Sequence, residues 1–225
     1  MIPKEEIKSK SIELGIPLVH IEKDYVMGWL LYGIYNNIIL KDKLVLKGGN
    51  CLRKVYFSDT RFSDDLDFTM IRTITSEQFK QELRKICADL SSTKNIPFKI
   101  EEIIVENKNC LEQGSVVFEG KVYFNGFAGD ESITLKIKFD ISSYEKIALP
   151  LQINNLIHNY SDSIDCKIQV LCYSLEEILA EKLRSIIQRT RARDLFDIVK
   201  IVLSEKIPIN KINIVKTGLS KIIFT

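Results

Sequence analysis

The chain has 225 residues, of which 45% are hydrophobic, and its formal net charge is only +2. This composition excludes a disordered polymer, a collagen-like repeat and a disulfide scaffold, and the small net charge excludes a polycation that coats nucleic acid in bulk. The N-terminus carries charged residues from Lys4 onward, so it lacks the apolar segment of a secretory signal peptide. Residues 26–40, the most apolar stretch, contain Asn36 and Asn37 and are too short to span a bilayer. We therefore expect a cytoplasmic protein.

The first part of the chain predicts helices around two short strands. From apolar periodicity and turn residues, we expect helices over residues 3–14 and 20–40, a strand over 44–46, a helix over 50–56, a strand over 65–70 and a helix over 75–90. The aromatic residues at helical spacing in the second helix are expected to pack in the core; they are Tyr25, Trp29, Tyr32 and Tyr35.

The second part of the chain predicts a run of strands followed by helices. We expect strands over residues 98–105, 115–124, 132–141 and 168–172, a hairpin turn over 125–130, and helices over 174–188 and 193–203. A capping box opens the first of these helices at Ser174–Glu177. A last helix is expected from Pro208, with Ile212, Val215 and Leu219 on its apolar side. The order predicts one mixed α/β (α+β) body, with residues 1–172 as the core under an N-terminal helical layer and residues 173–225 as a helical region.

The cysteines and histidines predict neither a disulfide framework nor a zinc site. The five cysteines form no CxxC pair and have no metal-like spacing with His20 or His158, so free buried thiols are expected. They are Cys51, Cys87, Cys110, Cys166 and Cys172. Neither histidine stands in a hydrolase-like motif with serine or cysteine, which gives a nucleophilic triad no support.

The glycine pair Gly48-Gly49 stands between an expected strand and an expected helix. This arrangement can bring backbone N–H groups against phosphate oxygens, although Gly-Gly also marks ordinary tight turns. Neither a Walker loop nor GxGxxG is present. Two clusters of basic residues favour a phosphate-bearing ligand; the alternative is that these residues form an ordinary solvated surface. One is expected around the glycines and comprises Lys41, Lys43, Lys47, Arg53, Lys54 and Arg61; the other is the run from Lys182 to Arg193, with five basic residues and no acidic one.

The stretch Asp64-Asp65-Leu66-Asp67 places carboxylates close together. On a strand, Asp65 and Asp67 point to one face, where they repel each other unless a cation lies between them. A hard divalent ion such as Mg²⁺ suits such oxygen ligands. Asp140, in another alternating strand, is the candidate third carboxylate of a two-metal site. The alternatives are an exposed acidic edge strand and, for Asp140, a surface position; Asp64 is expected to face the opposite way.

Four motifs together resemble a known family. LVLKGGNCLRKVY followed by RFSDDLDF is similar to the motif region of the AbiEii/AbiGii toxins, in the DNA polymerase β-like nucleotidyltransferase superfamily. A Glu-Lys pair in LEEILAEKLRSII and an Arg-Asp-x-x-Asp in RARDLFDIVKI follow in the family's order. The resemblance spans residues 44–201 and implies a nucleotidyltransferase fold, with a mixed-sheet core, N-terminal helices and a C-terminal helical region.

The resemblance implies an enzyme that transfers an NMP from an NTP to an RNA acceptor, the tRNA 3′ end first of all. It also implies a toxin of a toxin–antitoxin or abortive-infection system, with a cognate antitoxin as partner and Mg²⁺ (or Mn²⁺) as cofactor. The implied NTP-binding residues are Lys47, Gly48, Gly49, Asn50 and Ser63, although Asn50 replaces the family's usual hydroxyl residue. The implied metal ligands are Asp65 and Asp67, with Asp140 carried from the wider superfamily; Lys182, Asp194 and Asp197 complete the catalytic set.

Physical reasoning about the last motifs leaves alternatives open. Lys182 has basic neighbours and could neutralise a triphosphate without a paired acid, or it could pair with Glu177 or Glu181. Asp194 and Asp197 share a helix face, and Asp194 could instead serve the helix N-terminus. Other functions considered are a non-catalytic NTP- or RNA-binding module, nucleotidylation of a protein acceptor, and a metal-dependent phosphoesterase. The intact aspartate pair favours activity, and the scarcity of histidine disfavours the phosphoesterase.

Overall fold

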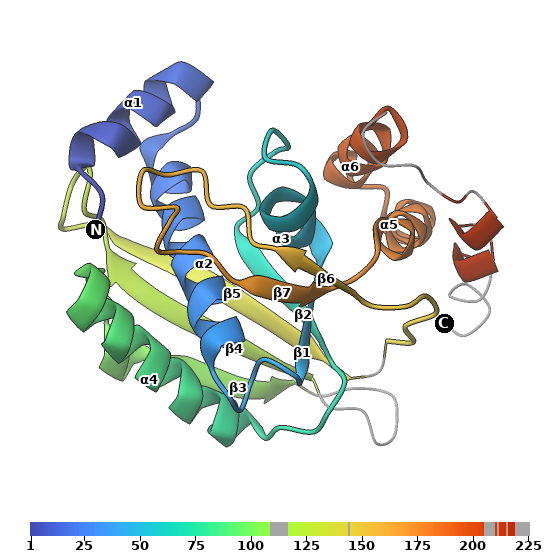
Figure 1. Ribbon diagram of the computed structural model, residues 1–225, viewed down its shortest axis with the longest axis horizontal. Coiled ribbons are helices and arrows are strands. Elements are labelled where there is room, and N and C mark those ends of the chain that lie inside the picture. The colour runs from blue at the N-terminus through green and yellow to red at the C-terminus, as the bar shows by residue number, and fades with distance from the viewer. Residues whose placement is uncertain (109–116, 144, 205–209, 211, 215, 219–225) are drawn as a thin grey trace.

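The computed structural model describes residues 1–108, 117–143, 145–204, 210, 212–214 and 216–218, and its centre is a seven-stranded mixed sheet (Figure 1). The strand order is β3-β4-β5-β2-β1-β7-β6. The strands are β1 (Leu44–Lys47), β2 (Asp65–Met70), β3 (Ile104–Lys108), β4 (Val117–Asn125), β5 (Thr134–Ser142), β6 (Gln152–Asn155) and β7 (Gln169–Cys172). β2 pairs antiparallel with β1 and parallel with β5, and β1 pairs parallel with β7.

Helices cover one face of this sheet and extend beyond one end of it (Figure 1). The helical elements are α1 (Lys4–Leu14), α2 (Leu18–Asn36), α3 (Gly48–Cys51) with a π-helical turn (Leu52–Tyr56), α4 (Ser76–Lys94), a 3-10 turn (Ile100–Glu102), α5 (Leu175–Arg189) and α6 (Ala192–Val202). α2 packs against α4, β5 and β7, and α5 packs against α6. No helix in the described part of the chain is long and apolar enough to cross a membrane.

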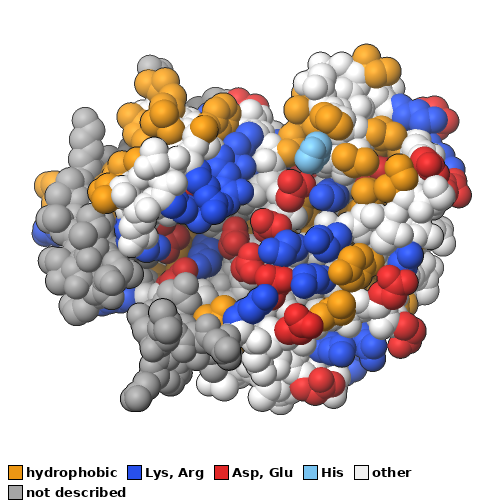
Figure 2. All heavy atoms as spheres, turned by 180° about the vertical axis from the view of Figure 1, so that it is seen from behind, with side chains coloured by type: hydrophobic (Ala, Val, Ile, Leu, Met, Phe, Trp, Pro, Cys, Tyr) orange, Lys and Arg blue, Asp and Glu red, His pale blue; other side chains and the backbone are white. Residues whose placement is uncertain are grey.

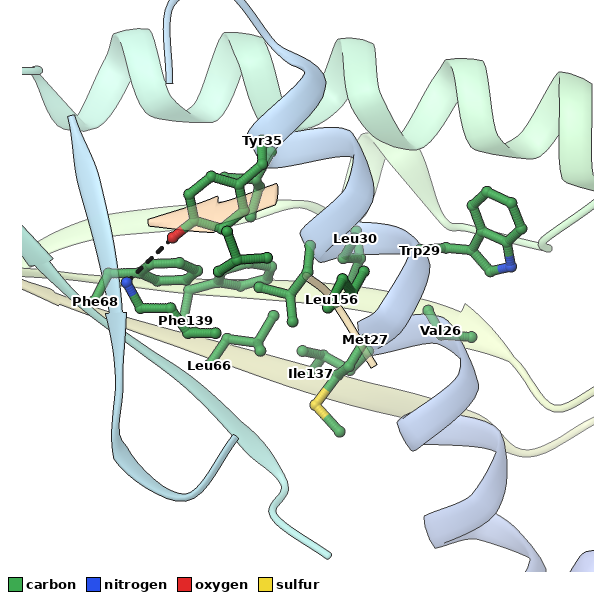
Figure 3. Packing of buried hydrophobic residues seen from close by; sticks show 14 of the residues in the cluster. Val26, Met27, Trp29, Leu30, Tyr35, Leu66, Phe68, Ile137, Phe139 and Leu156 are labelled. Atoms are coloured by element: carbon green, nitrogen blue, oxygen red, sulfur yellow. Dashed lines mark hydrogen bonds between the residues drawn. The ribbon is translucent and has the colours of Figure 1, made fainter. Parts of the chain in front are cut away.

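The core lies between α2, α4 and the sheet, and it fixes the position of β1. Apolar side chains of β2 and β5 lie beneath α2, as Figure 3 shows for Leu66, Phe68, Ile137 and Phe139. The hydroxyl of Tyr35, at the end of α2, accepts from the Leu46 N–H at 3.1 Å and donates to the Leu171 carbonyl at 2.8 Å. This buried contact joins α2 to β1 and β7, immediately before the glycine pair.

Most of the predicted elements are confirmed, and so is the mixed α/β class. The hairpin joins β4 to β5, with the Gly126 N–H donating to the Ile133 carbonyl at 2.8 Å. The four described cysteines, Cys51, Cys87, Cys166 and Cys172, are free and buried; Cys110 lies outside the described residues. Residues 212–214 and 216–218 are helical, whereas Pro208, Val215 and Leu219 lie outside the described residues.

Four local predictions differ from the structure. The single strand expected over 98–105 is wrong: Phe98 forms one bridge to Phe124, a 3-10 turn follows, and β3 begins only at Ile104. β6 was not predicted because an exposed, polar edge strand has no apolar alternation. The helix expected from residue 50 begins at Gly48. The capping box is half formed, since Ser174 Oγ accepts from the Glu177 N–H at 3.2 Å while the Glu177 carboxylate accepts from two other backbone N–H groups.

Candidate active site

A cavity of about 540 Å³ opens on the polar side of the sheet, where β1 ends and β2 begins. The strands provide one part of its lining, and α5 with the start of α6 provides another. Among the described residues that line it, eight are Lys or Arg and five are Asp or Glu. Figure 2 shows acidic side chains gathered in a hollow, with basic side chains on both flanks. This excess of positive charge favours an anionic ligand held beside carboxylates.

The glycine pair forms a turn at the edge of the cavity, and a side chain at either position would crowd the groups that line it. Gly48 has φ +72°, and a Cβ there would stand 2.3 Å from Asp67 Oδ2. A Cβ on Gly49 would stand 2.8 Å from Ser63 Oγ and 3.1 Å from an Arg61 guanidinium nitrogen. The backbone therefore passes directly against the carboxylate and the polar side chains of the cavity, and at Gly48 both the positive φ and this close approach favour glycine.

Three carboxylates meet on one face because of the sheet register. Asp67 lies opposite Asp140 on β5, Asp65 lies opposite Lys138, and Lys47 lies opposite Asp67 on β1. Since directly paired residues share a face, Asp65, Asp67 and Asp140 all project into the cavity. Within the described part of the chain, none of the three has a cation at ion-pair distance, although Lys47 and Lys138 are their nearest basic neighbours on the sheet.

The local electrostatics disfavour ionisation of two of these acids. Burial raises the pKa of Asp67 to about 7; the positive charge of Lys47 opposes this effect, and the negative charges of Asp140 and Asp65 add to it. Burial, together with Asp140, also raises the pKa of Asp65. The cluster thus lacks positive charge where its carboxylates converge. A cation bound there would reduce the repulsion between the carboxylates and favour their ionised forms.

Two glutamates that the sequence analysis did not select as site residues, Glu145 and Glu181, also line the cavity. Glu145 accepts a hydrogen bond from Lys47, and its carboxylate also lies 2.9 Å from the Thr69 hydroxyl. Burial lowers the pKa of Lys47, but Glu145 and Glu181 outweigh this effect, so that the net shift is upward. No local pattern marks Glu145. Glu181 belongs to the Glu-Lys motif, where it was considered only as a partner for Lys182.

The basic run from Lys182 to Arg193 converges on this cavity. All five of its basic residues line the cavity: Lys182, Arg184, Arg189, Arg191 and Arg193. α5 carries the first three, and Arg191 and Arg193 follow after Thr190, whose φ of +41° turns the chain sharply.

The basic group expected around the glycines does not gather there as a whole. Lys47 and Arg61 line the cavity, but Arg53 and Lys54 are buried in ion pairs with Asp24, at 2.6 and 2.9 Å. The two remaining lysines, Lys41 and Lys43, precede β1 at its other end. Their expected place beside the glycines was wrong because position in the sequence does not fix which side of a helix or strand faces the cavity.

Lys182 is paired with two acids, so the alternative in which it has no paired acid is wrong. Its Nζ lies 2.8 Å from Asp194 Oδ1 and 2.7 Å from Asp197 Oδ2. Both carboxylates come from α6, are almost completely buried and do not line the cavity. The ion pairs of Lys182 thus involve acids other than Glu177 and Glu181, which were considered from the sequence; Glu177 binds backbone N–H groups of residues 148 and 149.

Asn50 does not reach the cavity. Its side chain is fully buried, and Nδ2 donates to the carbonyl oxygens of Ser63 at 3.2 Å and Asp65 at 2.6 Å. The amide therefore holds the start of β2 against the glycine turn. Ser63 itself lines the cavity, as expected. Asp64 faces away from the cavity, exposed beside His20 and Lys23.

No three His, Cys, Asp or Glu side chains in the described ranges are already arranged to hold a metal ion. The donor set is nevertheless suited to one, because carboxylates without a paired cation are the oxygen ligands that Mg²⁺ prefers. The histidines offer no alternative ligand set. His20 lies at the surface, and His158 is buried among Tyr25, Trp29 and Tyr160.

Comparison with known proteins gives one family and a set of similar folds. The family model described as nucleotidyl transferase AbiEii toxin, type IV TA system, matches residues 29–217. The structure resembles MenT4, a nucleotidyltransferase toxin of Mycobacterium tuberculosis H37Rv, with TM-score 0.65 and 18% identity over 99% of this chain and 70% of that one. It also resembles JHP933 of Helicobacter pylori, with TM-score 0.53 and 19% identity over 83% and 67%. At these identities the structural likeness shows the fold alone. No curated protein sequence matches the chain.

Proposed function

The chain belongs to the AbiEii family of nucleotidyltransferase toxins of type IV toxin–antitoxin systems, and from this premise we propose that it transfers an NMP from an NTP to RNA. The first candidate acceptor is the tRNA 3′ end, in an Mg²⁺- or Mn²⁺-dependent reaction in the cytoplasm. The family resemblance inferred from the four motifs is confirmed, and with it the nucleotidyltransferase class and the toxin role. The metal, the acceptor, the abortive-infection role and the individual site residues are our proposals.

One observation supports the proposal above all others. Three carboxylates from β2 and β5 share a cavity with a glycine turn and with a wall of basic side chains from α5 and the start of α6. Nucleotidyl transfer needs these parts together, because negative charge accumulates on the phosphates while a hydroxyl attacks. Three carboxylates that have no cation at ion-pair distance among the described residues favour catalysis over nucleotide binding alone, which does not need such a cluster beside bound phosphates.

In this proposal Asp65 and Asp67 hold the divalent ion, with Asp140 as the third ligand. A divalent ion held by these carboxylates would neutralise the triphosphate and would activate the attacking hydroxyl. The backbone at Gly48 and Gly49 approaches the phosphates, with Lys47 and Ser63 beside them. Positioning and charge neutralisation by these groups account for most of the acceleration.

The basic wall is the proposed contact for both triphosphate and RNA. Lys182 lies nearest the acids of α6, whereas the arginines on the later part of α5 and at the start of α6 are more exposed. An RNA backbone binds mainly through phosphate contacts with such residues. A type IV system also implies an antitoxin, which we propose as the protein partner.

The test is transfer of label from each α-labelled NTP in turn to total tRNA in the presence of Mg²⁺. The double variant Asp65→Ala/Asp67→Ala is expected to abolish labelling. Asp64→Ala is a matched control, because Asp64 is adjacent but exposed and does not line the cavity. Label on RNA that is lost only in the double variant supports the proposal.

Other outcomes of the same experiment would redirect the assignment. Label on protein, with none on RNA, would show nucleotidylation of a protein acceptor. Tight NTP binding without transfer to any acceptor would indicate the binding module. Transfer that persists in the double variant would remove the carboxylates of β2 from the mechanism.

A further inference from the structure

Five charged side chains alternate in sign along the wall of the cavity that α5, α6 and the segment before β2 form. Arg61 pairs with Asp197 at 2.7 Å, Asp197 with Lys182 at 2.7 Å, Lys182 with Asp194 at 2.8 Å, and Asp194 with Arg189 at 3.2 Å. The three cations line the cavity, whereas Asp194 and Asp197 are 0% and 1% exposed. The wall therefore has cations in front and fixed carboxylates behind them.

Arg61 joins this wall to the glycine turn. A Cβ on Gly49 would stand 3.1 Å from Arg61 Nη2, so the guanidinium lies beside the turn proposed to receive the phosphates. Nε and Nη2 donate to the two oxygens of Asp197, at 2.8 and 2.7 Å, and Nη1 donates to the Phe62 carbonyl at 3.2 Å. A guanidinium has five N–H donors. Two of them consequently have no acceptor within the part of the chain that the structure describes.

Asp197 holds two cations from different parts of the chain. Its Oδ2 lies 2.7 Å from both Arg61 Nη2 and Lys182 Nζ, and its bond to Arg61 is bidentate. A planar bidentate pair fixes the direction of the guanidinium, which a single contact would leave free to rotate. Holding both cations before the ligand arrives reduces the entropy lost on binding.

We propose that Arg61 is a further triphosphate-binding residue of this site and that Asp197 is a positioning residue that holds Arg61 and Lys182 toward the phosphates. The proposal rests on the nucleotidyltransfer reaction proposed above. In it, Asp197 does not touch the ligand and acts by holding Arg61 and Lys182 in position. The competing explanation is a purely structural latch that ties α6 to the segment before β2. A latch predicts no preference for the number of phosphates on the ligand, whereas a triphosphate contact does.

The test compares binding of NTP with binding of the matching NMP. Binding of ATP, GTP, CTP and UTP is measured for the wild type in Mg²⁺ without acceptor, and the preferred nucleotide is then compared with its monophosphate. Arg61→Gln is expected to weaken NTP binding about 10- to 100-fold, the effect of losing a charge-assisted hydrogen bond, and NMP binding by less than about threefold. Arg72→Gln is the matched control, because Arg72 is exposed and does not line the cavity.

Asp197→Asn is expected to act through Arg61. It should weaken NTP binding about tenfold. In the double variant Arg61→Gln/Asp197→Asn, the loss of NTP affinity should be smaller than the product of the two single-variant losses, because the residues act as one unit. Arg61→Lys keeps the positive charge but loses the bidentate geometry, so an intermediate NTP affinity is expected. This variant is the one to compare if Arg61→Gln does not fold.

The outcomes separate this inference from the proposed function. A wild type that neither binds NTP nor labels an acceptor would contradict the proposed function itself. A wild type that binds and transfers, with Arg61→Gln or Arg61→Lys unchanged toward NTP, would overturn the role of Arg61. Equal losses for NTP and NMP would identify the latch instead, and independent effects of Arg61→Gln and Asp197→Asn would overturn the positioning role of Asp197.

Discussion

Gly48 lies so close to Asp67 that a Cβ on the glycine would stand 2.3 Å from the carboxylate oxygen. The φ of Gly48 is +72°, a left-handed backbone conformation that residues other than glycine rarely adopt. The turn that ends β1 and the central carboxylate of β2 are therefore fitted to each other. Any residue with a side chain at this position must move one of them.

Gly48→Ala is expected to abolish nucleotidyl transfer and to destabilise the fold by about 2–4 kcal/mol, because backbone strain and a steric clash add together. The matched control is Gly15→Ala, since Gly15 also has positive φ, +63°, but a Cβ there would meet nothing within 4 Å. The control should cost only about 1 kcal/mol and retain activity. Urea unfolding and the labelling assay measure both effects. An active Gly48→Ala enzyme would show that the close approach to Asp67 is unnecessary.

The pKa of Asp67 predicts a pH-dependent stability cost. Because the folded-state pKa is raised from 3.8 to about 7, the cost is absent below about pH 4, grows between the two values and is complete above pH 7. Asp67→Asn should therefore be more stable than the wild type at pH 8, by about 1–3 kcal/mol, and the difference should shrink toward pH 5. Unfolding in urea at the two pH values gives the comparison.

Divalent metal should remove this cost from the wild type. At pH 8, Mg²⁺ is expected to raise the unfolding midpoint of the wild type and to have a much smaller effect on Asp67→Asn, because a ligand that binds only the folded state stabilises it. Asp64→Asn serves as the control, since its carboxylate is exposed outside the cavity. If Asp67→Asn were less stable than the wild type at pH 8, the ionised carboxylate would have a stabilising partner in the folded protein.

Lys182→Met is expected to destabilise the protein by about 3 kcal/mol, because Asp194 and Asp197 would lose a shared cation while buried. Lys200→Met on α6 is the control: its ion pair with Asp59 is also 2.7 Å long but lies at the surface, so at most about 1 kcal/mol is expected. Adding Asp194→Asn to Lys182→Met should restore part of the stability without restoring transfer. Recovery of both would mean that Lys182 acts only in the fold.

Asn50→Ala is expected to cost about 1–3 kcal/mol, because the carbonyl groups of Ser63 and Asp65 would lose their buried donor. Transfer should also slow, since Asp65 begins β2 at this point. Asn155→Ala is the control, at an exposed position on the edge strand β6. A stable Asn50→Ala protein with weakened NTP binding would instead indicate a direct phosphate contact.

Local sequence pattern was enough to predict several features of the site. The alternation at Asp65 and Asp67 placed both carboxylates on one face, since a strand has a period of two whatever its partners are. The basic run Lys182–Arg193, which favoured a phosphate-bearing ligand, also lies together at the cavity, because α5 and the start of α6 that follows it directly carry all of it. These features depend on residues close together in the chain.

The tertiary structure alone decided which distant charges meet. The register of β2 against β5 placed Asp140 beside Asp67, and the packing of α6 gave Lys182 two buried acids. Arg53 and Lys54, near the glycines in sequence, turned inward to Asp24 instead. Periodicity fixes the direction of a side chain relative to its own element. Its partner depends on long-range packing, in which the desolvation of each charge must be balanced by another from elsewhere in the chain.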